Sequence, residues 1–342
     1  MTLVQTATRI GEMFAWPDSI SSLVIEHLVG QTRRRLRAET GAEDARFVQS
    51  LSAFPIAINA ADANAQHYEI PAKFFELVLG PQRKYSCCLY QDGAGSLAEA
   101  EERALAVTAR NALLQDGQDI VELGCGWGSL SLWMARHFPN ARITSVSNSH
   151  SQRRFIMDAA QRQGLGNLTV VTADMNGFTP SSTFDRVVSV EMFEHMINWR
   201  PLLERMNRAL KPDGLLFLHV FTHRSASYLF SKEDQNDWIA QHFFTGGIMP
   251  SQQLIKQFSD LFAVRQEWQW SGQHYAKTAG DWLANYDRNS AEIFDVLRRV
   301  YDSDARLWQR RWRLFFLATR GLFGHAGGNE WGVSHYQLAP VR

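Results

Sequence analysis

A short apolar segment that runs directly into three closely spaced glycines constrains the fold of this chain more than any other feature. Residues 119–123 read Asp-Ile-Val-Glu-Leu, which predicts a short buried strand. Gly124, Gly126 and Gly128 follow at alternate positions, and a helical pattern begins directly after them. Glycine permits a tight turn and a close approach of ligand to backbone, because it has no Cβ atom. Strand, glycine turn and helix together predict the first unit of a doubly wound nucleotide-binding fold.

The spacing of these glycines indicates the class of ligand. A dinucleotide fingerprint is G-x-G-x-x-G and places a pyrophosphate at the helix N-terminus. In this chain Glu122 lies two residues before the first glycine, so the pattern is acid-x-G-x-G-x-G. A carboxylate there would repel phosphate but suits a cationic ligand. The pattern resembles the first motif of class I S-adenosylmethionine (SAM) methyltransferases, which makes Glu122, Gly124 and Gly126 candidate cofactor residues. A tight turn without a ligand is the alternative.

The chain after the glycines alternates between predicted strands and predicted helices. Strand-like patterns are found at 141–146, 168–173, 184–190 and 215–220, and helix-like patterns at 152–163 and 199–210. This alternation is typical of an α/β fold in which helices cover both faces of a doubly wound, mostly parallel sheet. Ligands bind at the carboxyl ends of the strands in such sheets. The predicted strand ends include Ser147, Asp174 and Glu191.

The regions on either side of this alternation predict additions to the sheet. Residues 1–66 read as an N-terminal helical accessory region, and residues 67–342 as the methyltransferase domain. The alternation stops at about residue 224, and 224–330 predict a mostly helical cover inserted after the fifth strand. Its many aromatic residues could line an apolar pocket. Residues 331–338 predict a last strand that returns to the sheet. The N-terminal helices could close the pocket or form a homodimer contact.

Charge and cysteine content exclude several classes of function. The 342 residues contain 35 Lys and Arg and 35 Asp and Glu, a balance that argues against nucleic acid as the main partner. Cys87, Cys88 and Cys125 cannot form a disulfide framework, and no Cys–His spacing fits a zinc site. We therefore expect no bound metal and a cytoplasmic protein. No apolar run approaches the ~20 residues of a membrane helix, so we expect no integral membrane segment.

Two carboxylates and an imidazole follow directly after the predicted strand at 184–190. Glu191, Glu194 and His195 have the spacing i, i+3, i+4, which places them on one face if the segment is a helical turn. Such a cluster can attract an ammonium ion and accept its proton. The alternative is an acidic helix N-terminus, which the helix dipole favours in any case. The position at the end of a core strand favours the functional interpretation.

Polar residues at two other strand ends suit the cofactor. Ser147 and Gln152 follow the second strand, where many SAM enzymes place an acid that holds the ribose hydroxyls. No acid is present here, so these polar groups would do that work. Asp174 ends the third strand, where a carboxylate can accept a hydrogen bond from the adenine amino group. A turn or helix-cap residue is the alternative for Asp174.

Several sequence runs resemble the cyclopropane-fatty-acid synthase superfamily of SAM methyltransferases. Within it, the chain looks most like the coclaurine N-methyltransferases, which methylate the nitrogen of benzylisoquinoline alkaloids. The resemblance covers about residues 16–338. The matching runs include Tyr85-Ser-Cys-Cys, Glu122-Leu-Gly-Cys-Gly-Trp-Gly-Ser-Leu130, Glu191-Met-Phe-Glu-His-Met196, Leu210-Lys-Pro-Asp-Gly214 and Gly246-Gly-Ile-Met-Pro-Ser251.

This resemblance implies a class I SAM-methyltransferase (Rossmann-like) fold, SAM as the cofactor, and a small aromatic amine of the coclaurine or isoquinoline type as methyl acceptor. It implies that Glu194 and His195 act as base and substrate anchor, with Glu191 as a further carboxylate. The residues that it places at the SAM site are Tyr85, Ser86, Gly124, Gly126, Ser147, Gln152 and Asp174. Those that it places at the substrate are Tyr68, His219 and Trp331.

A lipid-modifying enzyme that cyclopropanates or C-methylates fatty acyl chains is the main alternative. By resemblance, lipid cyclopropane synthases hold a bicarbonate ion as base. The residues that could hold this ion here are Cys87, Glu194, His219 and Tyr275. Glu191 argues against this alternative, because the lipid enzymes carry glycine there. A SAM-binding protein without activity is disfavoured by the intact acid cluster. We therefore expect His195, oriented by Glu194, to accept the amine proton and Glu191 to anchor the amine.

Overall fold

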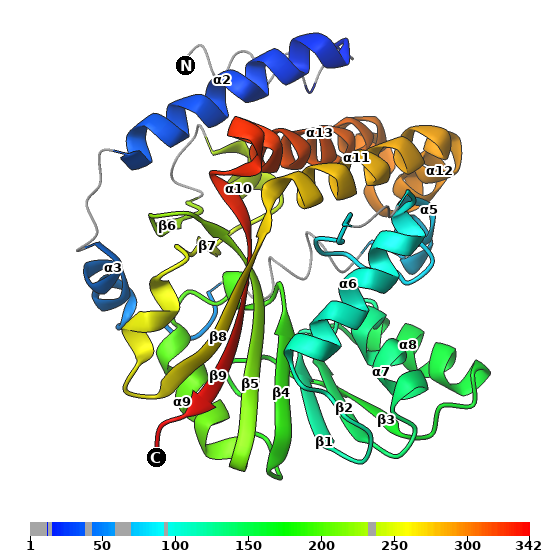
Figure 1. Cartoon of the computed structure of the whole chain (residues 1–342). Helices are drawn as coiled ribbons and strands as arrows, with labels where there is room; N and C mark the ends of the chain where they lie inside the picture. The colour runs from blue at the N-terminus through cyan, green and yellow to red at the C-terminus, as the bar shows by residue number, and fades with distance from the viewer. Residues whose placement is uncertain (1–11, 13–15, 38–42, 59–69, 92–94, 232–236) are drawn as a thin grey trace.

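A seven-stranded sheet runs through the centre of the computed structural model, which describes residues 12, 16–37, 43–58, 70–91, 95–231 and 237–342. In spatial order its strands are β3 (Leu168–Thr172), β2 (Arg142–Ser147), β1 (Asp119–Leu123), β4 (Phe184–Val190), β5 (Leu210–His223), β9 (Trp331–Pro340) and β8 (Phe262–Ser271). The first five are parallel, and β9 is antiparallel to both of its neighbours (Figure 1). The expected α/β fold with a mostly parallel sheet and a returning last strand is therefore confirmed.

Helices cover both faces of this sheet, because successive strand residues point to opposite faces. Ile120 of β1 belongs to one apolar cluster, and Val121, the next residue, belongs to the cluster on the other face. The first cluster is completed by α6 (Leu97–Asn111), α7 (Ser129–His137) and α8 (His150–Arg162), and the second by α9 (Trp199–Ala209) and α3 (Glu43–Leu51). A capping box formed by Ser96 and Glu99 begins α6.

The remaining helices form a cover beyond the carboxyl end of β5, where Phe221 contacts Phe323 with ring centroids 6.2 Å apart. The helices are α2 (Asp18–Arg37), α5 (Ala72–Val78), α10 (Trp238–His242), α11 (Gly272–Arg288), α12 (Ser290–Tyr301) and α13 (Ala305–Gly324). Figure 1 shows α11, α12 and α13 side by side above the sheet, with α2 across them. The expected cover at 224–330 is thus mostly helical, but it also supplies β8, the edge strand of the main sheet.

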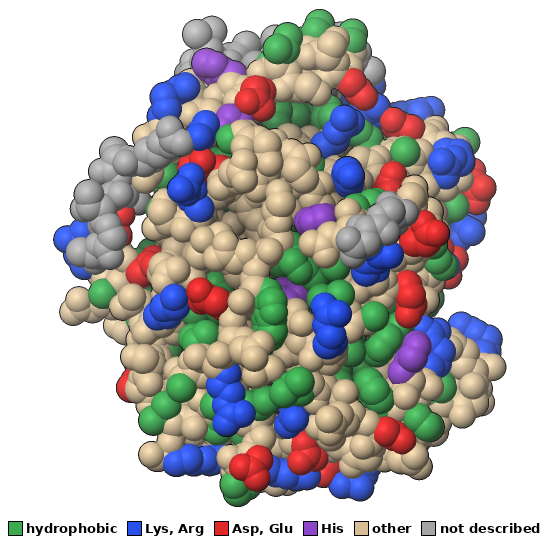
Figure 2. Space-filling model, in the orientation of Figure 1, with side chains coloured by type: hydrophobic (Ala, Val, Ile, Leu, Met, Phe, Trp, Pro, Cys, Tyr) green, Lys and Arg blue, Asp and Glu red, His purple; other side chains and the backbone are tan. Residues whose placement is uncertain are grey.

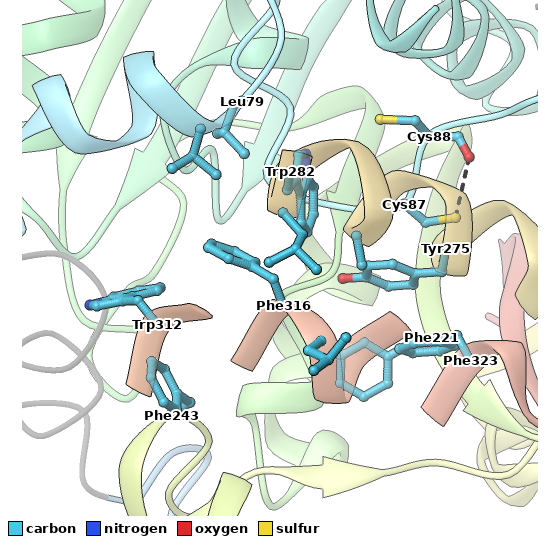
Figure 3. Packing of buried hydrophobic residues seen from close by; sticks show 14 of the residues in the cluster. Leu79, Cys87, Cys88, Phe221, Phe243, Tyr275, Trp282, Trp312, Phe316 and Phe323 are labelled. Carbon is cyan, nitrogen blue, oxygen red and sulfur yellow. Dashed lines mark hydrogen bonds between the residues drawn. The ribbon is translucent and has the colours of Figure 1, made fainter. Parts of the chain in front are cut away.

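Several short elements lie between these larger ones along the chain. They are the two-stranded β6 (Tyr228–Leu229) and β7 (Ile248–Met249), and the 3-10 helices η1 (Phe193–His195), η2 (Leu254–Phe258), η3 (Asp302–Asp304) and η4 (His325–Gly328). Between the cover and the sheet lies an aromatic cluster that includes Tyr275, Trp282 and Phe316 (Figure 3). This cluster fixes the position of α11 over the strand ends.

The surface carries both signs of charge interspersed over the face that Figure 2 shows, in keeping with equal numbers of acidic and basic residues. Over the part of the chain that the structure describes, no helix is both long enough and apolar enough to cross a membrane. Within the same residues, no group of three or more His, Cys, Asp or Glu side chains could hold a metal ion.

Candidate active site

The glycine turn, which we define as Gly124, Gly126 and Gly128, connects β1 to α7. All three have left-handed backbones, with φ of +79°, +51° and +81°. A Cβ atom at Gly124 would lie 2.4 Å from Met192 Cγ, and one at Gly128 would lie 2.6 Å from Ile156 Cγ1. At Gly126 a Cβ would meet no atom of the described residues within 4 Å. Glycine is therefore required for packing at two positions, whereas Gly126 faces open space.

That open space is part of a partly enclosed cavity of about 140 Å³ at the carboxyl ends of the parallel strands. Glu191 and His195 lie on its wall. The cavity also brings together every residue that the sequence assigns to the cofactor: Tyr85, Ser86, Glu122, Gly124, Gly126, Ser147, Gln152 and Asp174. This location agrees with the general position of ligands in doubly wound sheets.

Ser147 and Gln152 present polar groups to the cavity in a fixed arrangement. The Ser147 hydroxyl donates to Gln152 Oε1 at 2.7 Å and accepts from the Ser149 N–H at 3.0 Å. The Ser149 hydroxyl in turn caps α8. Gln152 Nε2 is buried and has no hydrogen-bond partner among the described residues. Buried amide donors are normally paired, so this one fits a ligand oxygen such as a ribose hydroxyl.

Glu122 is more enclosed than its place in the motif indicates. Its carboxylate accepts hydrogen bonds from Ser131 Oγ and, at 2.9 Å, from Ser145 Oγ. Burial raises the pKa of Glu122 to about 7, although these hydrogen bonds oppose the rise. The carboxyl group is therefore only partly ionised near neutral pH. Its hydrogen bonds tie β1 to β2 and α7, so it supports the glycine turn as well as lining the cavity.

Asp174 combines both of the roles that its sequence position allows. The residue is exposed and lies on the cavity wall. One carboxylate oxygen accepts from the Asn176 N–H at 2.8 Å, which is the geometry of a turn. The other oxygen is available to a donor such as an adenine amino group. Together with the open face of Gly126 and the unpaired Gln152 amide, Asp174 makes the cavity fit SAM.

Glu191 has an unusual backbone that sets the geometry of this part of the cavity wall. Its φ is +47°, a left-handed value that costs energy in any residue with a Cβ atom. Its N–H donates to the His219 carbonyl oxygen at 2.8 Å, and η1 begins only two residues later. Glu191 thus lies outside the helical turn that contains Glu194 and His195. The three side chains do not share one helical face, because only Glu191 and His195 line the cavity.

We define the acid pocket as Glu191 with the groups that donate to its carboxylate. Glu191 Oε1 accepts from the Cys87 N–H at 2.9 Å and lies 3.1 Å from His219 Nε2, while Oε2 accepts from the Tyr275 hydroxyl at 2.7 Å. Burial raises the pKa of Glu191, and the Lys84 cation and the hydrogen bonds oppose the rise. The two donors, the Cys87 N–H and the Tyr275 hydroxyl, favour the ionised form of this carboxylate.

Glu194 points away from the cavity and into the backbone of β5. Its Oε1 accepts from the Phe221 N–H at 2.6 Å, and its Oε2 has no hydrogen-bond partner among the described residues. Burial raises the pKa of Glu194 well above its ordinary value, and the Glu191 charge raises it further. The pKa of Glu194 is therefore raised further than that of Glu191, and Glu191 is the first of the pair to ionise. It makes no hydrogen bond to His195 within the described structure, so the expected orientation of His195 by Glu194 is not observed.

The residues expected at the substrate lie in three different settings. His219 is fully buried and contacts Glu191 rather than the cavity. Trp331 is also buried, and its indole N–H donates to the Tyr228 hydroxyl at 3.1 Å. Tyr68 lies outside the described residues. The sequence reasoning missed Lys84, whose buried ammonium donates to Ser86 Oγ and to the Cys87 carbonyl oxygen. Only its position next to the Tyr85-Ser-Cys-Cys run could have marked it.

Comparison with known proteins agrees with this site. The profile of the mycolic acid cyclopropane synthetase family matches residues 57–326. The (S)-coclaurine N-methyltransferase of Thalictrum flavum subsp. glaucum is 33% identical over 299 residues, which cover 86% of this chain and 83% of the relative. The cyclopropane-fatty-acyl-phospholipid synthase of Escherichia coli (strain K12) is 30% identical over 234 residues, covering 67% of this chain and 58% of that enzyme.

A solved structure gives the same assignment. Coclaurine N-methyltransferase bound to N-methylheliamine and SAH superimposes with a TM-score of 0.93 and 30% identity, over 98% of this chain and 99% of that one. The glycine turn, the cavity at the strand ends and these relatives lead to one conclusion. The chain belongs to the mycolic acid cyclopropane synthetase family, is a SAM-dependent methyltransferase, and is similar to the coclaurine N-methyltransferases over most of its length.

Proposed function

We propose that this enzyme transfers the methyl group of SAM to the nitrogen of a small aromatic amine of the coclaurine or isoquinoline type. The observation that carries the proposal is the Glu191 carboxylate, which is buried on the wall of the cavity that the glycine turn also lines and accepts hydrogen bonds from the Cys87 N–H and the Tyr275 hydroxyl. A buried anion of this kind selects a cationic group such as an ammonium ion. The relatives that are N-methyltransferases support the same reaction.

The chain contributes binding, orientation and proton transfer. SAM, when bound, supplies an electrophilic methyl group. Gly126, Gln152 and Asp174 would hold the cofactor, through close approach of the backbone, the unpaired amide and the free carboxylate oxygen. Glu191 attracts the ammonium form of the acceptor. His195, on the same cavity wall, accepts its proton so that the nitrogen lone pair is free to react. Orientation of the two reactants supplies most of the acceleration, roughly 7–11 kcal/mol.

Glu194 sets the charge balance of the site. Two carboxylates buried next to each other cannot both ionise readily, and the pKa of Glu194 is raised further than that of Glu191. Glu191 then presents the negative charge to the ammonium ion, next to the buried Lys84 cation that lines the same cavity. This arrangement suits a monocationic amine and gives Glu194 an indirect role through Glu191.

A lipid-modifying activity is the second candidate, because the family includes cyclopropane synthases. By resemblance, those enzymes hold a free bicarbonate ion with groups that correspond to Cys87, Glu194, His219 and Tyr275. In this chain the Cys87 N–H and the side chains of His219 and Tyr275 face the Glu191 carboxylate, whereas Glu194 accepts a hydrogen bond from the backbone of β5. The side chain of Glu191 thus fills the space that a free anion would need, which favours the amine as acceptor.

The decisive experiment measures S-adenosylhomocysteine release from SAM with a panel of secondary and tertiary arylalkyl amines. Phospholipid vesicles that contain unsaturated acyl chains are tested in parallel. We expect turnover with amines and none with vesicles, and no change when bicarbonate is removed from the buffer. Turnover with vesicles alone, or a strict need for bicarbonate, would assign the enzyme to the lipid-modifying group instead.

A further inference from the structure

A line of hydrogen-bonded side chains leads from the acid pocket into the interior of the sheet. His219 Nε2 lies 3.1 Å from Glu191 Oε1, and His219 Nδ1 lies 2.8 Å from His335 Nε2. His335 Nδ1 lies 3.1 Å from Asn111 Nδ2, at the end of α6. All three inner residues are buried. The antiparallel register of β5 and β9 places His219 directly opposite His335, which is why the two rings meet.

The direction of the hydrogen bonds along this line follows from the chemistry of its ends. Burial lowers the pKa of His219 and of His335 well below the ordinary value, so both rings are neutral. A neutral imidazole has one N–H and one acceptor nitrogen. The amide Nδ2 of Asn111 can only donate, so it requires an acceptor at His335 Nδ1. His335 then donates from Nε2 to His219 Nδ1, and His219 donates from Nε2 to Glu191.

We propose that Asn111 and His335 are positioning residues that hold His219 in its Nε2–H form and so keep Glu191 ionised for binding of the amine. This inference rests on the proposed function only for the role of Glu191. Neither Asn111 nor His335 lines the cavity. They act through His219, in the way that a buried acid fixes the tautomer of a catalytic histidine.

Other groups around Glu191 cannot replace this effect. The Cys87 N–H and the Tyr275 hydroxyl donate irrespective of the histidine tautomer. Lys84 acts on Glu191 through its charge, His195 does so once it has accepted a proton, and Glu194 adds a second carboxyl group nearby. If His219 instead turned an unprotonated Nε2 toward Glu191, two acceptors would face each other. The carboxyl group would then have to take up a proton, at a site where burial already favours the neutral form.

The hydrogen-bond line can be observed in the wild-type protein. In ¹⁵N NMR spectra of histidine-labelled enzyme near neutral pH, we expect both His219 and His335 to carry their proton on Nε2 and to have an unprotonated Nδ1. Assignment uses the His219→Gln and His335→Gln variants. An Nδ1–H tautomer of either ring, or a doubly protonated ring, would overturn the inference. This measurement needs no amine substrate and no activity.

Substitution of His335 separates positioning from packing. The His335 ring packs against Phe217 and Trp270, with centroid separations of 5.1 and 4.4 Å. His335→Phe preserves that aromatic packing but removes the donor to His219, whereas His335→Gln preserves an N–H donor and loses the ring. We expect His335→Phe to lower kcat/KM for the amine roughly tenfold or more and to move the acid limb of its pH profile up by about one unit.

The conservative variant provides the contrast. The His335→Gln variant should keep the wild-type pH profile, because its amide can donate to His219. A role in packing alone predicts the opposite order, with the Phe variant close to wild type. Gln337→Met is the matched control: Gln337 donates to the Asn111 carbonyl oxygen at 2.9 Å but lies outside the line, so its loss should leave the profile unchanged. S-adenosylhomocysteine affinity confirms that each variant is folded.

The two proposals fail in distinguishable ways. Background rates with every amine in the wild-type enzyme would overturn the proposed function. An Nδ1–H tautomer in the wild type, or an unchanged pH profile in the His335→Phe variant, would overturn only the role of Asn111 and His335.

Discussion

The glycine turn and the acid pocket form two walls of the cavity, and the two are built in different ways. The glycine turn is a property of the backbone within ten consecutive residues, and its conformation depends on which positions lack a Cβ atom. The acid pocket is assembled from side chains and one backbone N–H that come from β5, α11 and the segment before α6. Local backbone geometry therefore makes one wall, and long-range hydrogen bonding makes the other.

This difference predicts which step of the reaction each wall controls. A backbone cradle offers shape and close approach, which serve cofactor binding. A buried carboxylate with fixed donors offers charge and proton affinity, which serve the acceptor amine. Substitutions in the glycine turn should thus affect SAM binding, and substitutions in the acid pocket should affect turnover. The following variants test that division.

Gly126→Val should have the largest effect and abolish detectable binding of SAM and S-adenosylhomocysteine. The side chain would enter the cavity, and the φ of +51° strains a β-branched residue by roughly 1–3 kcal/mol. Isothermal titration calorimetry measures the affinity. Gly117→Val is the matched control, because Gly117 has a φ of +82°, has no neighbour within 4 Å among the described residues, and lies off the cavity. It should lose stability but bind normally; equal loss of binding in both would show that strain alone is responsible.

Glu191→Gly should lower kcat/KM for the amine roughly 10²–10³-fold and leave S-adenosylhomocysteine affinity nearly unchanged. Glycine also relieves the left-handed backbone at this position, so the variant should fold. Removal of the side chain leaves the donors of Cys87, His219 and Tyr275 without their acceptor. Formate should therefore bind between them and restore part of the activity, which steady-state kinetics with added formate would detect.

Glu191→Gln is the control for this rescue. Its amide fills the same space without a charge, so the rate should fall but formate should have no effect. Rescue of both variants, or of neither, would mean that the three donors do not form an anion site. Either result would remove the main argument that Glu191 replaces a free anion.

The sequence predicted the first wall much better than the second. The glycine turn and the sheet follow from patterns that local geometry determines. All of the expected cofactor residues line one cavity, although Tyr85 and Ser86 reach it from the segment before α6 and not from a strand end. The prediction that Glu191, Glu194 and His195 share one helical face was wrong. The left-handed φ of Glu191 turns its side chain toward partners far along the chain. His335 meets His219 only through the register of β5 and β9, which spacing along the sequence does not reveal.

His195→Ala should lower turnover about 10²-fold, the low end of what loss of a general base costs, with little change in cofactor affinity. The His195 ring also packs against Phe244, with centroids 4.3 Å apart. Phe244→Leu is therefore the matched control, because it disturbs the same contact but leaves the imidazole. If the two variants are equally slow in steady-state assays, His195 acts by packing and another group accepts the proton.

Glu122→Gln tests whether a carboxyl group in the wall of the glycine turn affects stability rather than turnover. The pKa of Glu122 in the folded protein is about 7, above its ordinary value of 4.5. Its protonated form stabilises the fold below about pH 4.5, and this contribution is lost as pH rises through 7. The shift corresponds to at most about 3 kcal/mol. The free energy of unfolding, measured by chemical unfolding, should therefore fall less between pH 4 and pH 8 in the variant than in the wild type. An identical fall in both proteins would contradict the raised pKa.

Glu194→Gln should have the smallest effect, with less than a tenfold change in kcat/KM, although it removes a carboxyl group next to Glu191. The reason is that burial and the neighbouring Glu191 raise the pKa of Glu194 well above its ordinary value, so a neutral amide that still accepts from the Phe221 N–H reproduces the protonated carboxyl group. Glu194→Ala leaves that buried N–H unpaired and should cost about 1–3 kcal/mol of stability. Urea unfolding and amine kinetics on both variants separate the two effects. A large loss of turnover in Glu194→Gln would mean that an ionised Glu194 takes part in proton transfer, and that the acid pocket holds two charges rather than one.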